Sequence, residues 1–379
     1  LTGLVLYALS TGDAEVRETV EYSMRSHLDF MLPDGAWDNS FGTRNFKWTY
    51  WGSRTSDGCQ VAYGLLGKSN PLFARAALEN ARLLARCTHD GFLCGGPDDH
   101  AHGEPPCVHH TLFHAKAFAT LLDYGVTAHE AESAVPVQLP RETATGVRHY
   151  PEIDTYLVAQ TDWRATVTGY DWEYAPASHA SGGALSLLWH AHWGPVLCAS
   201  LTQYELIEEN NMQLPIANDH ACLTPRLVYT DEKGNRYQSI LDVAAQVSAP
   251  MQVEKKPLLL RAEGQLVNEA HKAPHTGKVE FTAAYTFTPK EVELSFTCTR
   301  AAQCIFPVLA QGAMLTREDA FSVCFTRGEQ LLRVVANHAL VENASVFNLV
   351  PGFAAIPLTA SVTPGEPLRL TLTCSETQK

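Results

Sequence analysis

The apolar positions of the first 130 residues recur with the period of an α-helix. Asp13 can cap a helix in which Val20, Met24 and Leu28 follow one another at four-residue steps. Asn70 followed by Pro71 is typical of a helix start, and Gly125 of a helix end. Helices are therefore predicted over residues 13–32, 56–67, 70–88 and 109–124. The long, chemically varied loops between them favour helical hairpins arranged around a central cleft over a tight bundle.

From about residue 131 the pattern changes to short apolar runs separated by turn signals. Examples are "TYLVAQ", "ATVTGY", "VELSFTCT" and "LRLTLTC", and in the last of these leucine alternates with Arg or Thr. Lys233-Gly234-Asn235 and Arg327-Gly328-Glu329 have the composition of hairpin turns. The predicted fold is α+β: helices over 1–130, a proline-bearing connection over 131–152, and an antiparallel β-sandwich over 153–379.

Composition narrows the partners. The 379 residues have a net charge of −13, which argues against nucleic acid or an anionic membrane as the main partner. No apolar run reaches the ~18 residues needed to span a membrane. The chain opens with "LTGLVLYALSTGD", which reads as the middle of a helical region, so we expect a preceding segment.

The ten cysteines are scattered and form no CxxC motif, so most are expected to be reduced and half-buried. Cys94 and Cys107 flank a loop and are the strongest exception. Scattered cysteines favour a cytoplasmic protein, and a secreted or periplasmic form stays open because the start of the chain is expected to be missing.

The stretch "WDNSFGTRNFKWTYWGSRTSDG", residues 37–58, combines tryptophans with charges and has no helical or strand period. Ordering such a loop costs entropy, which suggests that it binds something. Trp48 and Trp51 can stack on sugar rings, while Asn45, Arg54 and Asp57 can bind hydroxyls or carboxylates. The alternative is an Ω-like loop that its tryptophans pin to the body of the protein.

Six of the sixteen histidines lie between residues 89 and 114. His110 and His114 are four residues apart, so both project from one helix face, as metal ligands often do. No HExxH motif or paired-cysteine spacing accompanies them. Substrate contact, a solvated or capping role, and metal binding all stay open. His109 and His110 follow a long loop and open a helix, which favours a position in a cleft.

The segment 163–204 is the most informative part of the second half. A strand leads into a loop that carries Tyr170, Tyr174 and His179, and Gly182-Gly183 allows the backbone to pass close to another group. Strands over 184–190 and 195–204 are predicted to form a hairpin about His192-Trp193-Gly194. His190 and His192 are expected on the surface of an edge strand.

The order "TYLVAQTDWRATVTGY", "HASGGALSLLW", "WGPVLCASLTQY" resembles the start of the β-sandwich domain in heparinase II/III-like polysaccharide lyases. His179 corresponds to the first histidine of that family's loop, Leu185-Ser186 to its Leu-Ser, and Tyr204 to its terminal tyrosine. The resemblance implies an (α/α) toroid before the sandwich. The family's second histidine and its aspartate fall on Ser181 and on Gly182 or Gly183, so its structural zinc site is expected to be lost. We therefore expect no metal and no other cofactor.

The resemblance also implies the substrate, an acidic polysaccharide or oligosaccharide containing uronic acid, and cleavage by β-elimination. Asn45 and Arg54 would offset the carboxylate charge. His109 or His110, the nearest equivalent of the family's Asn-His pair, would be the base. Tyr174 or Tyr204 would be the acid. The site is expected where residues 37–58, the His109 helix start and residues 170–179 converge.

Two other functions stay open. A uronoside glycoside hydrolase would use two carboxylates, for which the candidates are Asp38, Asp57, Asp98, Asp99 and Glu173. A non-catalytic carbohydrate-binding protein would use the same aromatic loop without chemistry. Ultraviolet absorbance separates the three, because only β-elimination makes an unsaturated uronate.

Overall fold

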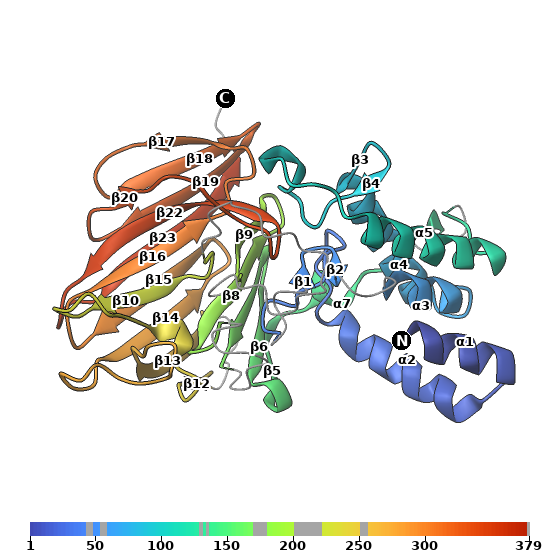
Figure 1. Ribbon diagram of the computed structural model, residues 1–379, viewed down its shortest axis with the longest axis horizontal. Coiled ribbons are helices and arrows are strands. Elements are labelled where there is room, and N and C mark those ends of the chain that lie inside the picture. The colour runs from blue at the N-terminus through green and yellow to red at the C-terminus, as the bar shows by residue number, and fades with distance from the viewer. Residues whose placement is uncertain are drawn as a thin grey trace. The chain divides into compact units, whose positions relative to one another are not determined.

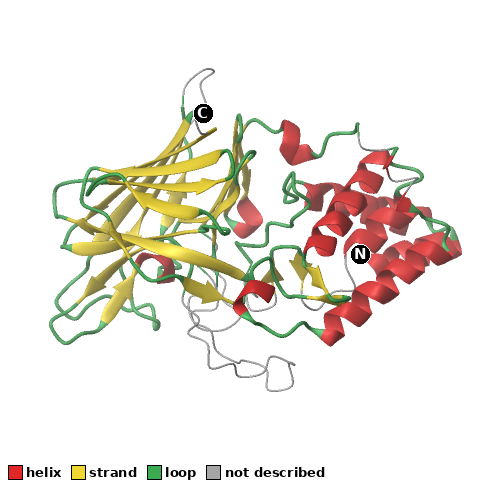
Figure 2. Cartoon of the chain, turned by 90° about the horizontal axis from the view of Figure 1, so that it is seen from above, coloured by secondary structure: helices red, strands yellow, loops and turns green. Residues whose placement is uncertain are grey.

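The computed structural model describes residues 1–42, 48–53, 59–128, 132–133, 136–169, 180–200, 222–250 and 257–376. The chain divides into two compact units (Figure 1). The helical unit comprises Leu1–Asn39 and Lys47–Ala144, and the sandwich unit comprises Ser40–Phe46 and Thr145–Lys379. The longer helices among the described residues belong to the first unit (Figure 2). None of the helices described is long and apolar enough to cross a membrane.

The helical unit contains the predicted helices with small changes at their ends. Its helices are α1 (Thr2–Thr11), α2 (Ala14–Leu28), α3 (Cys59–Leu66), α4 (Pro71–Arg86), α5 (Val108–Asp123) and the short α7 (Pro140–Thr143). The Asp13 carboxylate accepts a hydrogen bond from the Val16 N–H at 3.1 Å, and the Asn70 side chain accepts one from the Leu72 N–H at 3.1 Å. Both predicted N-caps are therefore confirmed.

The apolar stripe of α2 is buried as its spacing predicts. Val20, Met24 and Leu28 are at most 1% exposed and pack with Tyr63 and Phe73 in one core. The Tyr63 hydroxyl donates a hydrogen bond to the Met24 carbonyl at 2.9 Å, so the one polar atom of this aromatic is satisfied inside the core.

Two short hairpins interrupt the helices and were not predicted. One pairs β1 (Trp48–Thr49) with β2 (Gly52–Ser53), and the other pairs β3 (Thr88–His89) with β4 (Phe92–Leu93). The turn of the second is Asp90-Gly91, where φ is 50° and 79°. Positive φ at both central residues is what a type I′ hairpin turn requires. Strands of two residues are too short to show alternation, so the Asp90-Gly91 pair is the one sequence signal that indicates this hairpin.

The described residues of the sandwich unit form three antiparallel sheets. The eight-stranded sheet contains, in spatial order, β12 (Gln246–Ser248), β13 (Leu258–Gln265), β14 (Glu280–Phe287), β15 (Glu291–Cys298), β23 (Leu368–Glu376), β19 (Gln330–Ala336), β18 (Ser322–Arg327) and β17 (Met314–Arg317). The six-stranded sheet contains β11 (Arg236–Gln238), β10 (Arg226–Thr230), β16 (Ala302–Val308), β22 (Phe353–Val362), β20 (Val341–Glu342) and β21 (Val346–Asn348). The five-stranded sheet is a meander of β5 (Gly146–Tyr150), β6 (Thr155–Gln160), β7 (Trp163–Thr168), β8 (Ala184–His190) and β9 (Gly194–Cys198).

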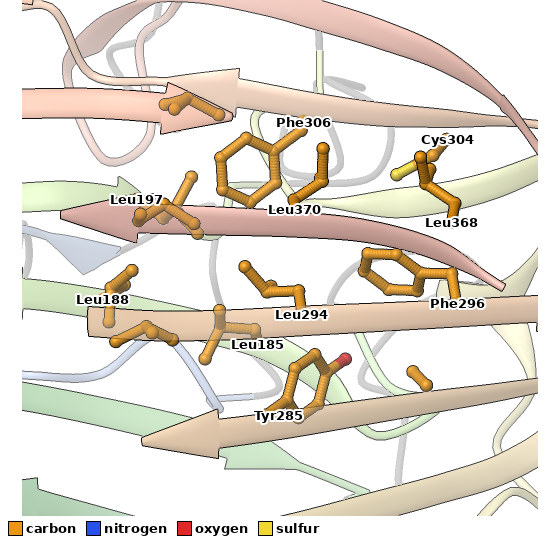
Figure 3. Close-up of a cluster of buried hydrophobic side chains, with 14 of the residues drawn as sticks. Leu185, Leu188, Leu197, Tyr285, Leu294, Phe296, Cys304, Phe306, Leu368 and Leu370 are labelled. Carbon is orange, nitrogen blue, oxygen red and sulfur yellow. The ribbon is translucent and has the colours of Figure 1, made fainter. Parts of the chain in front are cut away.

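One continuous apolar core joins the three sheets (Figure 3). Leu188 of the five-stranded sheet, Leu294 of the eight-stranded sheet and Phe306 of the six-stranded sheet all belong to it and are at most 1% exposed. The predicted antiparallel β-architecture is confirmed. Leu368, Leu370 and Leu372 are buried while Arg369 between them is exposed, as the alternation predicts.

Three details of the sandwich were predicted correctly and one was wrong. The turns at Gly234 (φ 83°) and Gly328 (φ 60°) join β10 to β11 and β18 to β19. His190, expected on the surface, is only 5% exposed. The reason is that β8 pairs with β7 on one side and β9 on the other, so it is not an edge strand. His192, in the turn that follows, is exposed as expected.

Candidate active site

The tryptophan-rich loop is anchored inside the helical unit by Trp51. This side chain is 1% exposed, and its indole N–H donates a hydrogen bond to the Cys94 carbonyl at 3.1 Å. The rings of His110 and His114 meet it edge-on, with centroids 5.9 and 4.8 Å away. A residue that stacks on a sugar needs an exposed ring face. The ring of Trp51 is buried and packs against His110 and His114.

Asn80 of α4 holds two separate turns against the helices. Its side-chain amide is 1% exposed and donates to the carbonyls of Gly35 and Trp51, each at 2.9 Å. Gly35 has a φ of 88°, and a Cβ there would lie 2.3 Å from the Glu79 carbonyl oxygen. Only glycine fits at this point. Asn80 therefore fixes the backbone just before the loop, at Gly35, and again within it, at Trp51.

Asp38, one of the carboxylates considered for a hydrolase, forms a buried ion pair. Its carboxylate lies 2.8 Å from the Arg141 guanidinium, and the two side chains are 0% and 3% exposed. Asp99 is also buried, at 1% exposed, and begins the short 3₁₀ helix His100–His102. Asp57 and Glu173 lie outside the described residues. Because Asp38 is buried beside Arg141, it has a structural partner and no access to solvent.

His109 and His110 face different surroundings although they are adjacent. Helix α5 begins at Val108, so the two side chains project about 100° apart. His109 is exposed and packs against Phe113, with ring centroids 4.3 Å apart. His110 is 7% exposed and packs against Trp51. The structure thus separates one solvent-facing imidazole from one that belongs to the interior.

Two other histidines of this region, His89 and His100, lie together at the β3–β4 hairpin. The rings of His89 and His100 stack with centroids 3.9 Å apart, and both lie near the Cys94 thiol. Burial, and then the nearby Asp99 carboxylate, raise the pKa of that thiol to about 11. The sequence pattern pointed to His110 and His114 as a pair, and the structure joins these two to Trp51.

Most of the other predicted site residues lie outside the described part of the chain. These are Asn45, Arg54, Asp57, Tyr170, Tyr174, His179 and Tyr204. For Trp48 only the backbone is described, as part of β1. Their roles stay predictions.

In the sandwich, the glycine pair of the family-like motif makes the close approach that was predicted. Gly182 and Gly183 have φ values of 69° and 66°. A Cβ on Gly182 would lie 2.0 Å from the Ser239 carbonyl oxygen, and one on Gly183 would lie 2.2 Å from the Ala262 Cβ. The hairpin that follows is formed by β8 and β9 about residues 191–193, as predicted, but β9 ends at Cys198 and the predicted strand continued to residue 204.

Two further features of the described residues are the cysteines and a cavity in the helical unit. None of the nine cysteines whose side chains are described, Cys94 and Cys107 among them, is in a disulfide, and six of the nine are buried. A partly open cavity of about 280 Å³ between α3, α4 and α5 is lined by groups such as Ala77, Phe118 and Leu121, with Lys68 and Thr127 as its polar residues. An apolar lining of this kind does not suit a charged sugar.

Both units match models of one protein family. The model described as the ulvan lyase N-terminal domain matches residues 1–142, and that of the ulvan lyase C-terminal domain matches residues 147–375. A broad-specificity ulvan lyase of Formosa agariphila is 36% identical over 371 residues. That match covers 94% of this chain, and the chain spans 57% of the relative's length.

Heparinases are among the solved structures to which this chain is similar. The match to a heparinase III structure covers 100% of this chain and 59% of that one, with a TM-score of 0.45 and 8% identity. The match to a heparan sulfate lyase HepC mutant from Pedobacter heparinus covers 96% of this chain and 57% of that one, with a TM-score of 0.45 and 10% identity. These scores decide nothing about function. The family models and the curated relative confirm the predicted membership of a polysaccharide lyase family: the chain belongs to the ulvan lyase family.

Proposed function

We propose that this protein cleaves a uronic-acid-containing polysaccharide by β-elimination. The observation that carries the proposal is the match of both units to the ulvan lyase family, together with 36% identity to a relative named as a broad-specificity ulvan lyase. Ulvan is therefore the first substrate to test, and other acidic polysaccharides or oligosaccharides follow.

The chemistry defines what the site must supply. The proton on C5 of a uronate lies next to a carboxylate and is weakly acidic. A base can remove it only when nearby cations or hydrogen-bond donors offset the carboxylate charge as it becomes enolate-like. A second group must protonate the oxygen that leaves C4.

Among the described residues, His109 suits the role of base. Its imidazole is exposed at the start of α5, where a substrate can reach it, and the contact with Phe113 limits its orientation. His110 is buried against Trp51, so we assign it the positioning of this helix turn. The helix N-terminus also favours a nearby substrate carboxylate, because its first N–H groups point outward.

The remaining roles fall to residues outside the described part of the chain. Asn45 and Arg54 would neutralise the carboxylate, and Tyr174 or Tyr204 would be the acid. Trp48, Asp57, Tyr170 and His179 would contact the sugars. These assignments are supported by residue chemistry and by the resemblance of the motif around Leu185-Ser186 to that of heparinase II/III-like lyases.

The proposed steps balance without water. Neutral His109 takes the C5 proton, the released electron pair forms the C4–C5 double bond, and the C4–O bond breaks. The tyrosine hydroxyl gives its proton to the leaving oxygen. One product carries an unsaturated uronate, and the other carries a new hydroxyl end.

We also propose that the helical unit is part of an (α/α) toroid. The successive helices α1 to α5 and the long loops between them support it, as does the match of residues 1–142 to the family's N-terminal domain.

The test is a panel of uronate polysaccharides, beginning with ulvan, followed by ultraviolet absorbance and by a reducing-end assay. A lyase raises both signals. A hydrolase raises only reducing ends, and a binding protein raises neither while still retaining the polysaccharide in an affinity gel.

The residue test is His109→Ala, with His102→Ala as the matched control on another exposed histidine. Loss of a general base should slow turnover by about a hundredfold or more, and the control should retain activity. Full activity of His109→Ala would show that His109 is not the base. Products of hydrolysis would show that the protein is a hydrolase and not a lyase.

A further inference from the structure

The His-rich loop brings two imidazoles and one thiol together at a place that the proposed lyase chemistry does not use. The ligand atoms of His89, Cys94 and His100 all lie within 4.8 Å of one another. His89 is half-buried, Cys94 is buried and His100 is exposed. The three residues come from a hairpin and from the 3₁₀ helix that follows it.

The hairpin places His89 and Cys94 on the same face. His89 pairs with Phe92 and Thr88 with Leu93, and the Cys94 N–H donates to the Cys87 carbonyl at 2.9 Å one step further on. Alternate residues of an antiparallel pair share a face, so Cys94 is a diagonal neighbour of His89. The type I′ turn at Asp90-Gly91 sets this register.

The backbone around Cys94 is held from several sides. Its carbonyl accepts the Trp51 indole N–H at 3.1 Å. The neighbouring Leu93 accepts the Cys107 N–H at 3.1 Å and donates its own N–H to the Thr111 hydroxyl at 2.9 Å. The thiol therefore has a defined position without any metal, as a preorganised ligand requires.

His100 completes the group from the other end of the loop. Residues 95–99 return the chain to the hairpin, and the His102 N–H then donates to the carbonyls of Asp98 and Asp99, each at 3.1 Å. The resulting 3₁₀ turn sets the His100 ring 3.9 Å from that of His89, with an angle of 8° between the planes. On a tetrahedral zinc ion, neighbouring ligand atoms lie about 3.3–3.7 Å apart. To bind one ion, the three ligand atoms must therefore draw closer, and the His89 and His100 rings must turn out of their parallel stack so that a nitrogen of each points at the metal.

We propose that His89, Cys94 and His100 bind a Zn²⁺ ion that fixes the loop between the β3–β4 hairpin and α5. Two imidazole nitrogens and a thiolate are ligands for zinc, whereas calcium and magnesium require oxygen. Coordination removes the thiol proton, which passes to solvent, and water fills the fourth position. The site is distinct from the zinc pattern expected around Ser181 in the sandwich, and it carries no step of the elimination.

Metal content and cobalt spectra test the proposal directly. The protein as purified, after removal of loosely bound ions, is expected to contain one zinc per chain. After chelation and reconstitution with Co²⁺, it should show a thiolate-to-cobalt charge-transfer band, which requires a cysteine ligand.

Matched variants locate the ion. His100→Gln should weaken zinc binding by about 10–100-fold or more, while His102→Gln, on the same short helix, should leave it unchanged. Cys94→Ser should abolish the charge-transfer band, and Cys107→Ser should retain it. Because Cys94 is buried, the exposed His100 variant keeps the test decisive even if Cys94→Ser folds poorly.

A stability readout separates this site from adventitious binding. Zinc should raise the thermal midpoint of the wild type by several degrees and leave that of His100→Gln unmoved, since only a site present in the folded state couples to folding. The proposal fails if the wild type gives no charge-transfer band, or if His100→Gln and His102→Gln bind zinc equally. Neither result depends on lyase activity.

Discussion

Different interactions fix the backbone in the helical unit and in the sandwich. In the sandwich, strands of all three sheets contribute apolar side chains to one core. In the helical unit, buried polar side chains fix the loops, among them Asn80 on two carbonyls, Trp51 on Cys94 and the Arg141–Asp38 pair. A periodic core tolerates many single changes, whereas a polar contact between distant residues depends on both partners. The following variants test that difference, from the largest expected effect to the smallest.

The sandwich should be most sensitive where two backbones touch. Gly182→Ala places a Cβ 2.0 Å from the Ser239 carbonyl oxygen at a positive φ of 69°, and both strain and clash are unavoidable. We expect a loss of more than about 4 kcal/mol in the free energy of unfolding, or no folded protein.

Gly234→Ala is the control for that variant. Its φ is 83° and nothing lies within 4 Å of the new Cβ, so only the conformational cost of about 1–2 kcal/mol should remain. Urea denaturation measures both. Equal losses would mean that the close approach at Gly182 is relaxed by its surroundings.

Breaking the buried ion pair should be costly in the helical unit. Arg141→Met leaves the Asp38 carboxylate buried without its cation, and we expect a loss of about 3–5 kcal/mol. Arg25→Met, which breaks an exposed pair with Glu21, should cost less than about 1 kcal/mol.

The double variant Arg141→Met with Asp38→Leu sharpens the comparison. Removing both charges should recover most of the stability, because the penalty comes from one unpaired buried charge. A double variant as unstable as Arg141→Met would show that packing of the arginine side chain, and not charge, is what the unit needs.

Asn80 tests a neutral contact of the same kind. Asn80→Leu leaves the Gly35 and Trp51 carbonyls without their donor, and we expect a loss of about 2–3 kcal/mol by thermal or urea denaturation. Asn337 is the control in the sandwich, since it also makes two hydrogen bonds to backbone but is exposed. If Asn337→Leu cost as much as Asn80→Leu, burial of the polar contact would not be the distinguishing feature.

Near neutral pH, the smallest expected effect is a pH dependence shared by the two units, which stays below about 1 kcal/mol for each site between pH 7 and 6. His27 of the helical unit, beside Tyr63 and Trp37, has its pKa lowered to about 4, mainly by burial. His190 of the sandwich has its pKa lowered to about 4 mainly by burial, with Asp162 opposing and His192 and Arg164 adding to the shift.

The sign follows from where each proton binds. Below pH 6.5 the unfolded chain takes up protons that these folded histidines refuse, so stability falls between pH 6.5 and 4 by up to about 1.4 kcal/mol per pH unit for each site and then levels off. Replacement by Gln at either position should flatten the curve by that site's share, and His102→Gln should not. An unchanged pH profile in His27→Gln and His190→Gln would contradict the lowered pKa values.

The sequence by itself determined the features that depend on neighbours along the chain. Asp13 and Asn70-Pro71 start helices because a cap needs only the next few N–H groups. Leu368, Leu370 and Leu372 point inward because strand residues alternate. The motif around Gly182 and Leu185-Ser186 likewise carried the resemblance that led to the polysaccharide lyases.

Only the tertiary structure decided which of the chemically capable residues are buried, exposed or brought together. Nothing near Trp51 in the sequence shows that its indole meets the Cys94 carbonyl, or that Asp38 meets Arg141. The adjacent His109 and His110 differ in exposure because a helix turns each residue to a new face, and the packing of that helix chooses which face is inside. Such contacts join residues far apart in the chain, where local periodicity carries no information.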